Sequence, residues 1–354
     1  MSKYNNKNIK LMIPRETYTQ KKCIGAGSFG NVYLIQSNNT NLEYARKQII
    51  LNTLSKDEEK LALREVTISK KFKHPNIILF KEAFITKKPE RTLHLITEYA
   101  DNGDLEQILK KHKEKNELFT ENIIINWLIQ ICLALKYIHN LNIIHRDIKP
   151  SNIFLTKKNI IKIGDFGISI ALTRTLIKAK STIGTPLYMA PEVFDSSNYD
   201  YKADIWSLGI TFFQLITLND PFKGNSPFGL YKNIIEGKKN MSINESNTYY
   251  SQELIDIVKK MLLKNPNQRP SINEIFEVPI IKQNLEKFLE ENKELYKDVK
   301  IDLNNNNNNN LKGNKFYLTT INEDEDEEMI QPSIFLKETI LETKVKENNE
   351  SSEI

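Results

Sequence analysis

The spacing of hydrophobic residues changes near Gly103, and this change predicts the fold class. Residues 18–84 alternate apolar and polar side chains in short runs such as "KKCIGAGSFGNVYLIQ" and "LEYARKQII", which is typical of strands. One helix, "SKDEEKLALREVTISKKF", interrupts them, and Ser55 can cap it. Beyond Gly103 apolar residues repeat at helical spacing, first at Trp127, Ile131, Leu135 and Ile138. We therefore predict an α+β fold in which a small β-rich lobe precedes a larger helical lobe.

The composition also changes toward both ends of the chain. Residues 1–17 are rich in Asn and Lys, so we expect them to be flexible. The folded body is expected to consist of an N-terminal lobe, 18–98, and a C-terminal lobe, 99–281. Residues 301–354 include seven consecutive Asn and the run "EDEDEE", so we expect a disordered tail.

A last helix is expected over residues 282–300. Its apolar stripe consists of Ile281, Leu285, Phe288, Leu295 and Val299, with Asn292 as a break. Such a stripe can pair in a coiled coil or pack on its own body. The run covers fewer than three heptads, which favours packing on the body.

Charge and cysteine content narrow the classes of protein only a little. The chain has 354 residues and a net charge of +5, but residues 301–354 hold 5 Lys and 12 Asp or Glu, which leaves about +12 on the rest. A basic body suits phosphates or nucleic acid, and charge alone does not choose between them.

We found no apolar run near the roughly 20 residues of a membrane span and no signal core at the N-terminus. Cys23 and Cys132 match no disulfide or ligand pattern, so an intracellular, cytoplasmic location is expected.

The glycine-rich run "GAGSFG" (25–30) fits the pattern G-x-G-x-x-G. In a dinucleotide-binding fold a helix would follow the last glycine, whereas the alternating run "NVYLIQ" follows here. The glycines therefore bridge two strands, as in a flap whose backbone N–H groups approach phosphate oxygens. An ordinary hairpin is the alternative.

Two neighbouring cations, Arg46 and Lys47, lie in the predicted strand "EYARKQII". Strand side chains alternate between faces, so Ala45 and Lys47 share one face and Arg46 points outward from the other. If Ala45 lies against a flat base, Lys47 can reach phosphates from the same side. Glu65 on the predicted helix could hold that ammonium group, although a solvated surface ion pair is the ordinary alternative.

Two polar loops carry the remaining chemistry. In "IIHRDIKPSNIFL" (143–155), Asp147 can orient and deprotonate a hydroxyl, and Lys149 can neutralise a transferring phosphoryl group. The amide oxygen of Asn152 can bind magnesium. In "IKIGDFGIS" (161–169), Asp165 suits a metal-bridging carboxylate on a mobile hinge. Both loops, in this order behind a glycine flap and its lysine, indicate phosphoryl transfer.

Residues 18–281 resemble the eukaryotic protein kinase family in "GAGSFGNV", "ARK", "HRDIKPSN", "DFG", "APE" (190–192), "DIWSLG" (204–209) and Arg269. The resemblance implies a bilobal fold that binds ATP with Mg²⁺, or with Mn²⁺ in its place. It implies that Lys47 anchors phosphates with Glu65 as partner, that Asp147 is the base, and that Asn152 and Asp165 bind metal. His145 resembles a core histidine of the family, with a structural role.

The resemblance also implies a nucleotide site built from the flap, the hinge and the adenine pocket. The implied residues are Ile24, Gly25, Gly27, Ser28, Phe29, Gly30, Val32, Ala45, Glu98, Ala100, Asp104 and Phe154, of which Asp104 would contact the ribose.

Lys149, placed two residues after Asp147, and Thr185 before Pro186 resemble serine/threonine kinases rather than tyrosine kinases. "WLIQICLALKYIHNLNIIHRDIKPSNIFL" and "STIGTPLYMAPE" look most like the NIMA-related kinases. The resemblance implies a protein substrate with a Ser or Thr acceptor. No nucleic-acid or membrane partner is expected. The tail is short and lacks the long coiled coil of many NIMA-related kinases, so either a monomer or a weak dimer is expected. By family analogy it implies a cell-cycle, microtubule or cilium role, with the cytoskeleton, centrosome or nucleus as further locations. The alternative is a catalytically weak, pseudokinase-like scaffold, although none of Lys47, Asp147 and Asp165 is lost.

The sequence also predicts a regulatory segment, and it differs from the kinase family pattern at Ser69 and Arg46. Ser181 and Thr182 precede the "GTP" turn, and Arg146 could clamp a phosphate on them, unless both hydroxyls are merely solvated. Ser69 stands where the family usually has a large apolar residue, which would leave the helix loosely docked. Arg46 also replaces an apolar residue, with little effect on ATP expected.

Overall fold

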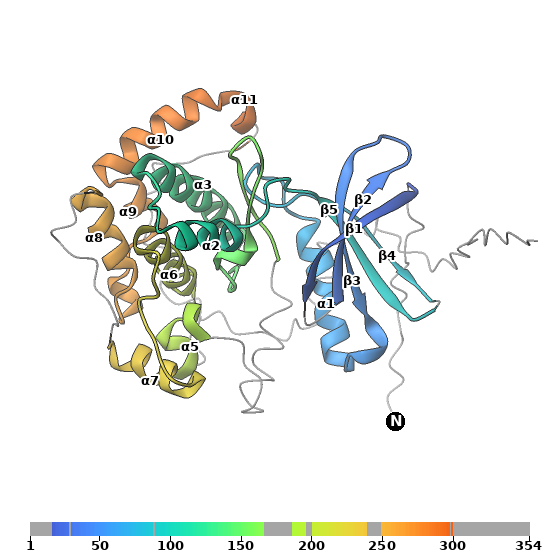
Figure 1. Cartoon of the computed structure of the whole chain (residues 1–354), viewed down its shortest axis with the longest axis horizontal. Helices are drawn as coiled ribbons and strands as arrows, with labels where there is room; N and C mark the ends of the chain where they lie inside the picture. Colours follow the sequence, from blue (N-terminus) through green and yellow to red (C-terminus); the bar gives the residue numbers. More distant parts are fainter. Residues whose placement is uncertain are drawn as a thin grey trace, which may run out of the picture. The chain divides into compact units, whose positions relative to one another are not determined.

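The computed structural model describes residues 16–27, 30–87, 89–165, 186–195, 200–238, 249–297 and 299. The predicted sites Ser28, Phe29, Ser181, Thr182 and Thr185 lie outside the described residues, as do nearly all of 1–17 and the tail 301–354. The chain forms two compact units (Figure 1). The first contains residues up to 60 and 80–99, and the second contains 61–79 and the described residues from 100 onward.

The first unit is built on a five-stranded antiparallel sheet with strand order β1-β2-β3-β5-β4. Its small core joins Ile35, Phe84 and Ile96 to three tyrosines at its margin. The helix α1 begins in this unit, and the Ser55 side chain and Glu58 form reciprocal capping bonds at its start, as predicted. The elements are β1 (Tyr18–Gly27), β2 (Gly30–Ser37), β3 (Glu43–Ile50), η1 (Leu51–Thr53), α1 (Lys56–Ser69), β4 (Phe80–Thr86) and β5 (Thr92–Glu98).

The register of the sheet confirms the predicted faces of β3. Lys47 lies opposite Val32 of β2, whereas Arg46 lies opposite Tyr33. Directly paired residues share a face, so Lys47 and Arg46 point to opposite sides of the sheet. The expectation that Arg46 merely points outward is incomplete, because its guanidinium stacks 5.6 Å from the Tyr33 ring and donates to Gln20. It is half-buried, and this burial lowers its pKa.

Among its described residues, the second unit is helical apart from one two-stranded hairpin (Figure 1). Its central helix is α3, whose predicted core residues are all at most 3% exposed. The helices are α2 (Leu105–Lys115), α3 (Glu121–Asn140), α5 (Pro191–Asp195), α6 (Lys202–Thr217), α7 (Pro227–Glu236), α8 (Gln252–Met261), α9 (Ile272–Phe276), α10 (Pro279–Glu291) and α11 (Lys293–Tyr296). The hairpin is β6 (Ile153–Leu155) with β7 (Ile161–Ile163), and the short helices are η2 (Pro150–Asn152), η3 (Pro186–Tyr188) and η4 (Pro266–Gln268).

The helix α3 has the length and the apolar composition of a membrane span. Among the described residues it is the one helix that is long and apolar enough to cross a bilayer, so the expectation that no run approaches this length was too strict. In the structure 67% of that stretch is buried inside the protein, against α6, α9, α10 and β7. Its apolar surface is thereby covered by the protein's own core.

The last predicted helix is in fact two helices. α10 ends at Glu291, and the Asn292 side chain donates to the Phe288 carbonyl where the chain breaks before α11. Ile281, Leu285 and Phe288 are buried in the second unit's core, which confirms packing on the body for this part. Leu295 was wrongly predicted to face the core: it is 41% exposed, and the break rotates Tyr296 inward in its place.

Candidate active site

Three predicted residues meet in the loop before η2. The Lys149 ammonium lies 2.9 Å from Asp147 Oδ2. Asn152 Nδ2 donates to the same oxygen at 2.7 Å and to the Asp147 carbonyl at 2.8 Å. One carboxylate oxygen of Asp147 is thus held by two donors. These two contacts fix the orientation of the carboxylate within the loop.

The orientation of the Asn152 amide follows from these contacts. Both of its partners on Asp147 are acceptors, so the nitrogen must face them and Oδ1 must point elsewhere. Asn152 is only 5% exposed, so this orientation is fixed by its surroundings. Its Oδ1 is an oxygen ligand of the kind that Mg²⁺ prefers.

His145 joins this loop to the segment that carries Asp165. Its Nδ1 accepts from the Asp147 N–H at 3.3 Å, and its Nε2 donates to the Gly164 carbonyl at 3.0 Å. A ring that accepts at one nitrogen and donates at the other is neutral. Burial lowers the pKa of His145, consistent with that state. The predicted structural role fits this geometry.

Gly164 has no room for a side chain. An added Cβ would lie 2.8 Å from the Phe154 ring and 3.1 Å from Ile78. Its N–H also donates to the Asn152 carbonyl. Asp165 follows at once, with an exposed side chain and a φ of +53°. Asp165 and Asn152, the two expected metal ligands, are therefore tied to a common backbone position.

Asp204 on α6 supports the site, a role that the sequence match "DIWSLG" (204–209) left unassigned. It is fully buried, and its carboxylate accepts from the N–H groups of His145 and Arg146 and from the His139 ring. Burial alone would raise the pKa of Asp204, but its partners His139, His145 and Arg146 together outweigh burial, and the pKa is lowered. Arg146 has a φ of +72°, so this carboxylate holds the loop in a conformation that non-glycine residues rarely adopt. A lone acid within the apolar helix "ADIWSLGITFFQLI" was the available signal.

Two predicted nucleotide-binding residues lie side by side in the second unit. Phe154 of β6 forms a β-bridge with Asp104. Asp104 caps α2, because its carboxylate accepts from the Gln107 N–H and side chain at 2.8 Å. The sequence predicted a ribose contact for Asp104, and its role as the N-cap of α2 is an additional finding. Ala100, also in this unit, is 7% exposed.

The other described nucleotide-site residues lie in the first unit. These are Ile24, Gly25, Gly27, Gly30, Val32, Ala45, Lys47 and Glu98. Lys47 belongs to the first unit and Glu65 to the second, so their predicted pairing stays a prediction. Glu65 is 4% exposed, which does not fit the alternative of a solvated surface pair. Ser69 is also buried, at 9% exposed.

The donor set fits a hard metal ion that also contacts a nucleotide. Among the described residues no three His, Cys, Asp or Glu side chains form a cluster sufficient for a metal by itself. Asn152 and Asp165 supply oxygen atoms only, which suits Mg²⁺ or Mn²⁺ rather than a soft metal. Phosphate oxygens and water would complete such a site.

A buried ion pair anchors the helix α5. Arg269 binds Glu192 of α5 through two bonds of 2.6 and 2.7 Å. Its three other N–H groups donate to the carbonyls of Leu263, Lys202 and Lys264. The guanidinium also lies 4.9 Å from the Trp206 ring. Every donor of this fully buried cation therefore has a partner.

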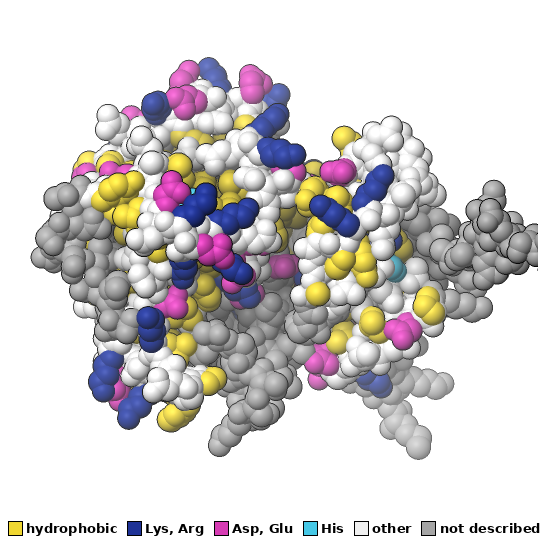
Figure 2. Space-filling model, in the orientation of Figure 1, with side chains coloured by type: hydrophobic (Ala, Val, Ile, Leu, Met, Phe, Trp, Pro, Cys, Tyr) yellow, Lys and Arg dark blue, Asp and Glu magenta, His cyan; other side chains and the backbone are white. Residues whose placement is uncertain are grey.

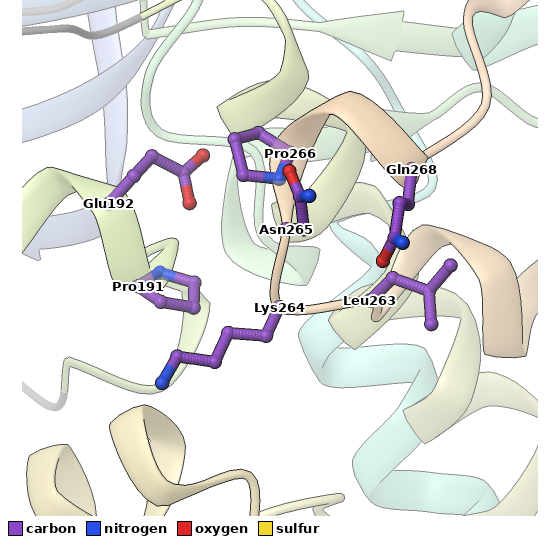
Figure 3. A pocket seen from close by; sticks show the side chains of 7 residues that line it. All are labelled: Pro191, Glu192, Leu263, Lys264, Asn265, Pro266 and Gln268. Carbon is purple, nitrogen blue, oxygen red and sulfur yellow. The ribbon is translucent and has the colours of Figure 1, made fainter.

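A pocket of about 630 Å³ lies beside this ion pair (Figure 3). Its walls come from α5 and from the segment before Arg269, and Figure 3 shows the Lys264 side chain extended along it. None of the predicted site residues lines it. The lining residues are Pro191, Glu192, Leu263, Lys264, Asn265, Pro266 and Gln268.

The surface charge bears on the nucleic-acid alternative. On the face shown in Figure 2, Lys and Arg side chains are interspersed with Asp and Glu among the described residues. A nucleic-acid-binding surface usually presents a continuous basic patch or stripe. The excess positive charge therefore does not favour that alternative on this face.

Comparison with known proteins decides the family. Residues 18–281 match the protein kinase domain family. The chain belongs to this family. Its β-sheet N-terminal lobe and helical C-terminal lobe agree with the match, so the predicted fold class is confirmed.

The curated relatives confirm the resemblance to NIMA-related kinases. Serine/threonine-protein kinase Nek1 of Mus musculus is 38% identical over 274 residues, which cover 77% of this chain and 22% of the relative. Nek3 of Mus musculus is 40% identical over 256 residues, 72% of this chain and 48% of the relative. The G2-specific protein kinase fin1 of Schizosaccharomyces pombe is 33% identical over 285 residues, 75% of this chain and 39% of the relative. The chain spans about a fifth to a half of the length of these relatives.

Proposed function

We propose that this chain is an ATP-dependent protein serine/threonine kinase of the NIMA-related type. The main support is the loop in which Lys149 and Asn152 hold the Asp147 carboxylate within 2.9 Å. Membership of the protein kinase family supplies the reaction class. A weak scaffold would not need a carboxylate held by two donors.

In the proposed reaction the hydroxyl oxygen of a Ser or Thr attacks the γ-phosphorus of ATP. The bond to the β–γ bridging oxygen breaks, and ADP leaves. Asp147 orients the hydroxyl and accepts its proton, while Lys149 offsets charge on the transferring group. Lys47 is proposed to bind phosphates of the nucleotide. Mg²⁺ held by Asn152 Oδ1 and Asp165 would neutralise charge on the phosphate oxygens.

A phosphate-transfer assay with Asp147→Asn tests this proposal. Purified protein, labelled ATP and Mg²⁺ or Mn²⁺ are incubated with a casein-like substrate, and autophosphorylation is followed in the same samples. We expect Asp147→Asn to lower turnover by at least about a hundredfold, because the general base is lost. Asp256→Asn is the matched control: this acid on α8 bonds only to Gln252 among the contacts described, and the variant should remain active.

Two outcomes would contradict the proposal. Wild-type protein that transfers no phosphate with either metal would leave the scaffold alternative. Asp147→Asn with wild-type turnover would remove Asp147 from the role of base.

Regulation by phosphorylation of Ser181 or Thr182, with Arg146 as the phosphate clamp, is part of the proposal. The support is that Arg146 follows His145 directly and has its backbone N–H anchored on Asp204. Ser181→Ala combined with Thr182→Ala should lower turnover several-fold or more, because the segment loses its ordering charge. Phosphatase treatment should lower the activity of wild type but not of the double variant. Equal turnover of both proteins would exclude the switch.

The cellular setting is proposed from the relatives. The name of fin1 describes a G2-specific kinase, which supports a cell-cycle role for this chain. Protein substrates follow from the family, and a cytoplasmic, cytoskeletal or nuclear location is proposed with them. Imaging of the tagged protein through the division cycle tests this setting.

A further inference from the structure

The short helix α11 places one side chain in the core of the second unit. Tyr296 is 5% exposed, although the family match ends at residue 281. Its ring packs edge-on against Phe288 at 5.5 Å and against His74 at 6.1 Å. Its hydroxyl donates to Asn76 Oδ1 at 2.5 Å. A residue beyond the matched domain therefore contacts the loop that follows α1.

Asn76 is the junction of this contact. It is fully buried, and its Nδ2 donates at 2.9 Å both to Gln130 Oε1 of α3 and to the Ile161 carbonyl of β7. Gln130 Oε1 also accepts from the Ile161 N–H, so it can only be an acceptor here. These partners fix the amide nitrogen of Asn76 toward β7 and leave Oδ1 to receive the Tyr296 hydroxyl.

The backbone around Asn76 is paired with β7 as well. The Ile163 N–H donates to the Asn76 carbonyl, and the Ile78 N–H donates to the Ile163 carbonyl, both at 2.8 Å. Ile77 and Ile163 form a parallel β-bridge. Gly164 then packs against Ile78 without space for a Cβ, and Asp165 is the next residue. The position of Asp165 therefore depends on the loop that Asn76 anchors.

We propose that Tyr296 is a positioning residue for Asp165, acting through Asn76 and β7. This inference rests on the proposed function, in which Asp165 binds the metal. Without the hydroxyl, Asn76 Oδ1 is a buried acceptor that has lost its donor. This cost weakens the closed arrangement in which Asn76 also binds Gln130 and Ile161, so the strand that ends beside Asp165 opens more often.

Tyr296→Phe is the test variant, because it keeps the ring packing and removes only the hydroxyl. Tyr250→Phe is its matched control: Tyr250 is 4% exposed and donates to the Phe119 carbonyl at 2.9 Å, a hydrogen bond in which no residue of β7 takes part. Hydrogen exchange of β7 amides is measured without nucleotide, and the Mg²⁺ dependence of turnover is measured separately.

We expect Tyr296→Phe to speed exchange of the Ile161 and Ile163 amides about three- to tenfold, as loss of one hydrogen bond allows. The Mg²⁺ concentration for half-maximal turnover should rise by a similar factor, with turnover at saturating Mg²⁺ less affected. Tyr250→Phe should change neither quantity, even if it unfolds at a similar urea concentration.

Tyr296→Phe that behaves like Tyr250→Phe in both measurements would overturn the inference. Faster exchange with an unchanged Mg²⁺ dependence would also overturn it, because the link to Asp165 would be missing. An inactive wild type would instead count against the proposed kinase function, and the exchange of β7 would still report on Tyr296.

Discussion

Arg269 shows at the scale of one residue how a charge can be buried without being isolated. Removing a guanidinium from water is costly unless its donors are all paired. Here two bonds to Glu192 and three to main-chain carbonyls meet that need. The same contacts join α5 to the segment between α8 and α9, which lie far apart in sequence.

Arg269→Ala should lower the free energy of unfolding by about 3–5 kcal/mol, because it removes the buried cation that pairs with the Glu192 carboxylate and donates to three carbonyls. Urea unfolding followed by fluorescence measures this loss. Lys282→Ala is the control, since its pair with Glu277 is exposed on both sides and should leave the unfolding midpoint unchanged. A midpoint for Arg269→Ala equal to that of the control would contradict the argument.

At the scale of an element, the glycine flap shows that similar residues have different reasons to be present. A Cβ at Gly30 would lie 1.8 Å from the Gln48 carbonyl, and φ there is +141°. A Cβ at Gly25 would meet only Val32, at an ordinary 3.7 Å. Gly30 is therefore required by the close approach of β3 and by its positive φ, whereas Gly25 is not required by the fold.

Gly30→Ala should cost about 2–4 kcal/mol of stability, since the backbone of β3 must move away from the new methyl group. Gly25→Ala should stay within about 0.5 kcal/mol of wild type. Urea unfolding of the two variants, compared with wild type, decides the matter. Equal losses at both positions would contradict the assignment.

The same element shows what the sequence could and could not predict. The pattern G-x-G-x-x-G and the alternation of "NVYLIQ" were enough to predict two strands around a glycine turn. They could not rank Gly25 and Gly30, because the neighbour that decides, Gln48, comes from another strand.

In the helices, too, local patterns could be predicted from the sequence, whereas features that depend on tertiary contacts could not. α3 was predictable because its apolar spacing is a local signal. The inward turn of Tyr296 in place of Leu295 was not, because it depends on a break at Asn292. Likewise, Asp147, Lys149 and Asn152 stand within six residues, so their meeting was predictable, whereas Asp204 and Asn76 reach the site only through tertiary contacts.

At the scale of the whole molecule, buried histidines link stability to pH. Burial lowers the pKa of His74 and of His94 to about 4, and it also lowers the pKa of His145. His94 lies in the first unit and the other two lie in the second. Folded protein thus keeps these rings neutral at a pH where the unfolded chain already binds protons, near 6.5.

Stability should therefore be fully present above pH 6.5 and fall as the pH drops toward 4. Each histidine with a folded pKa of about 4 can account for up to about 3 kcal/mol of this loss. Urea unfolding at pH 7.5, 6.5, 5.5 and 4.5 measures the slope. His94→Gln should reduce the slope, and a profile that is flat or rises toward acid would contradict the assignment.

The packing of α10 and α11 has a practical consequence for where the protein can be cut. A fragment that stops at residue 281 would keep every recognisable kinase motif. It would nevertheless lose Leu285, Phe288 and Tyr296. The apolar surface of α3 and α9 that α10 covers would then be exposed to solvent. Such a fragment invites aggregation in the test tube, and an expression boundary after residue 299 avoids it.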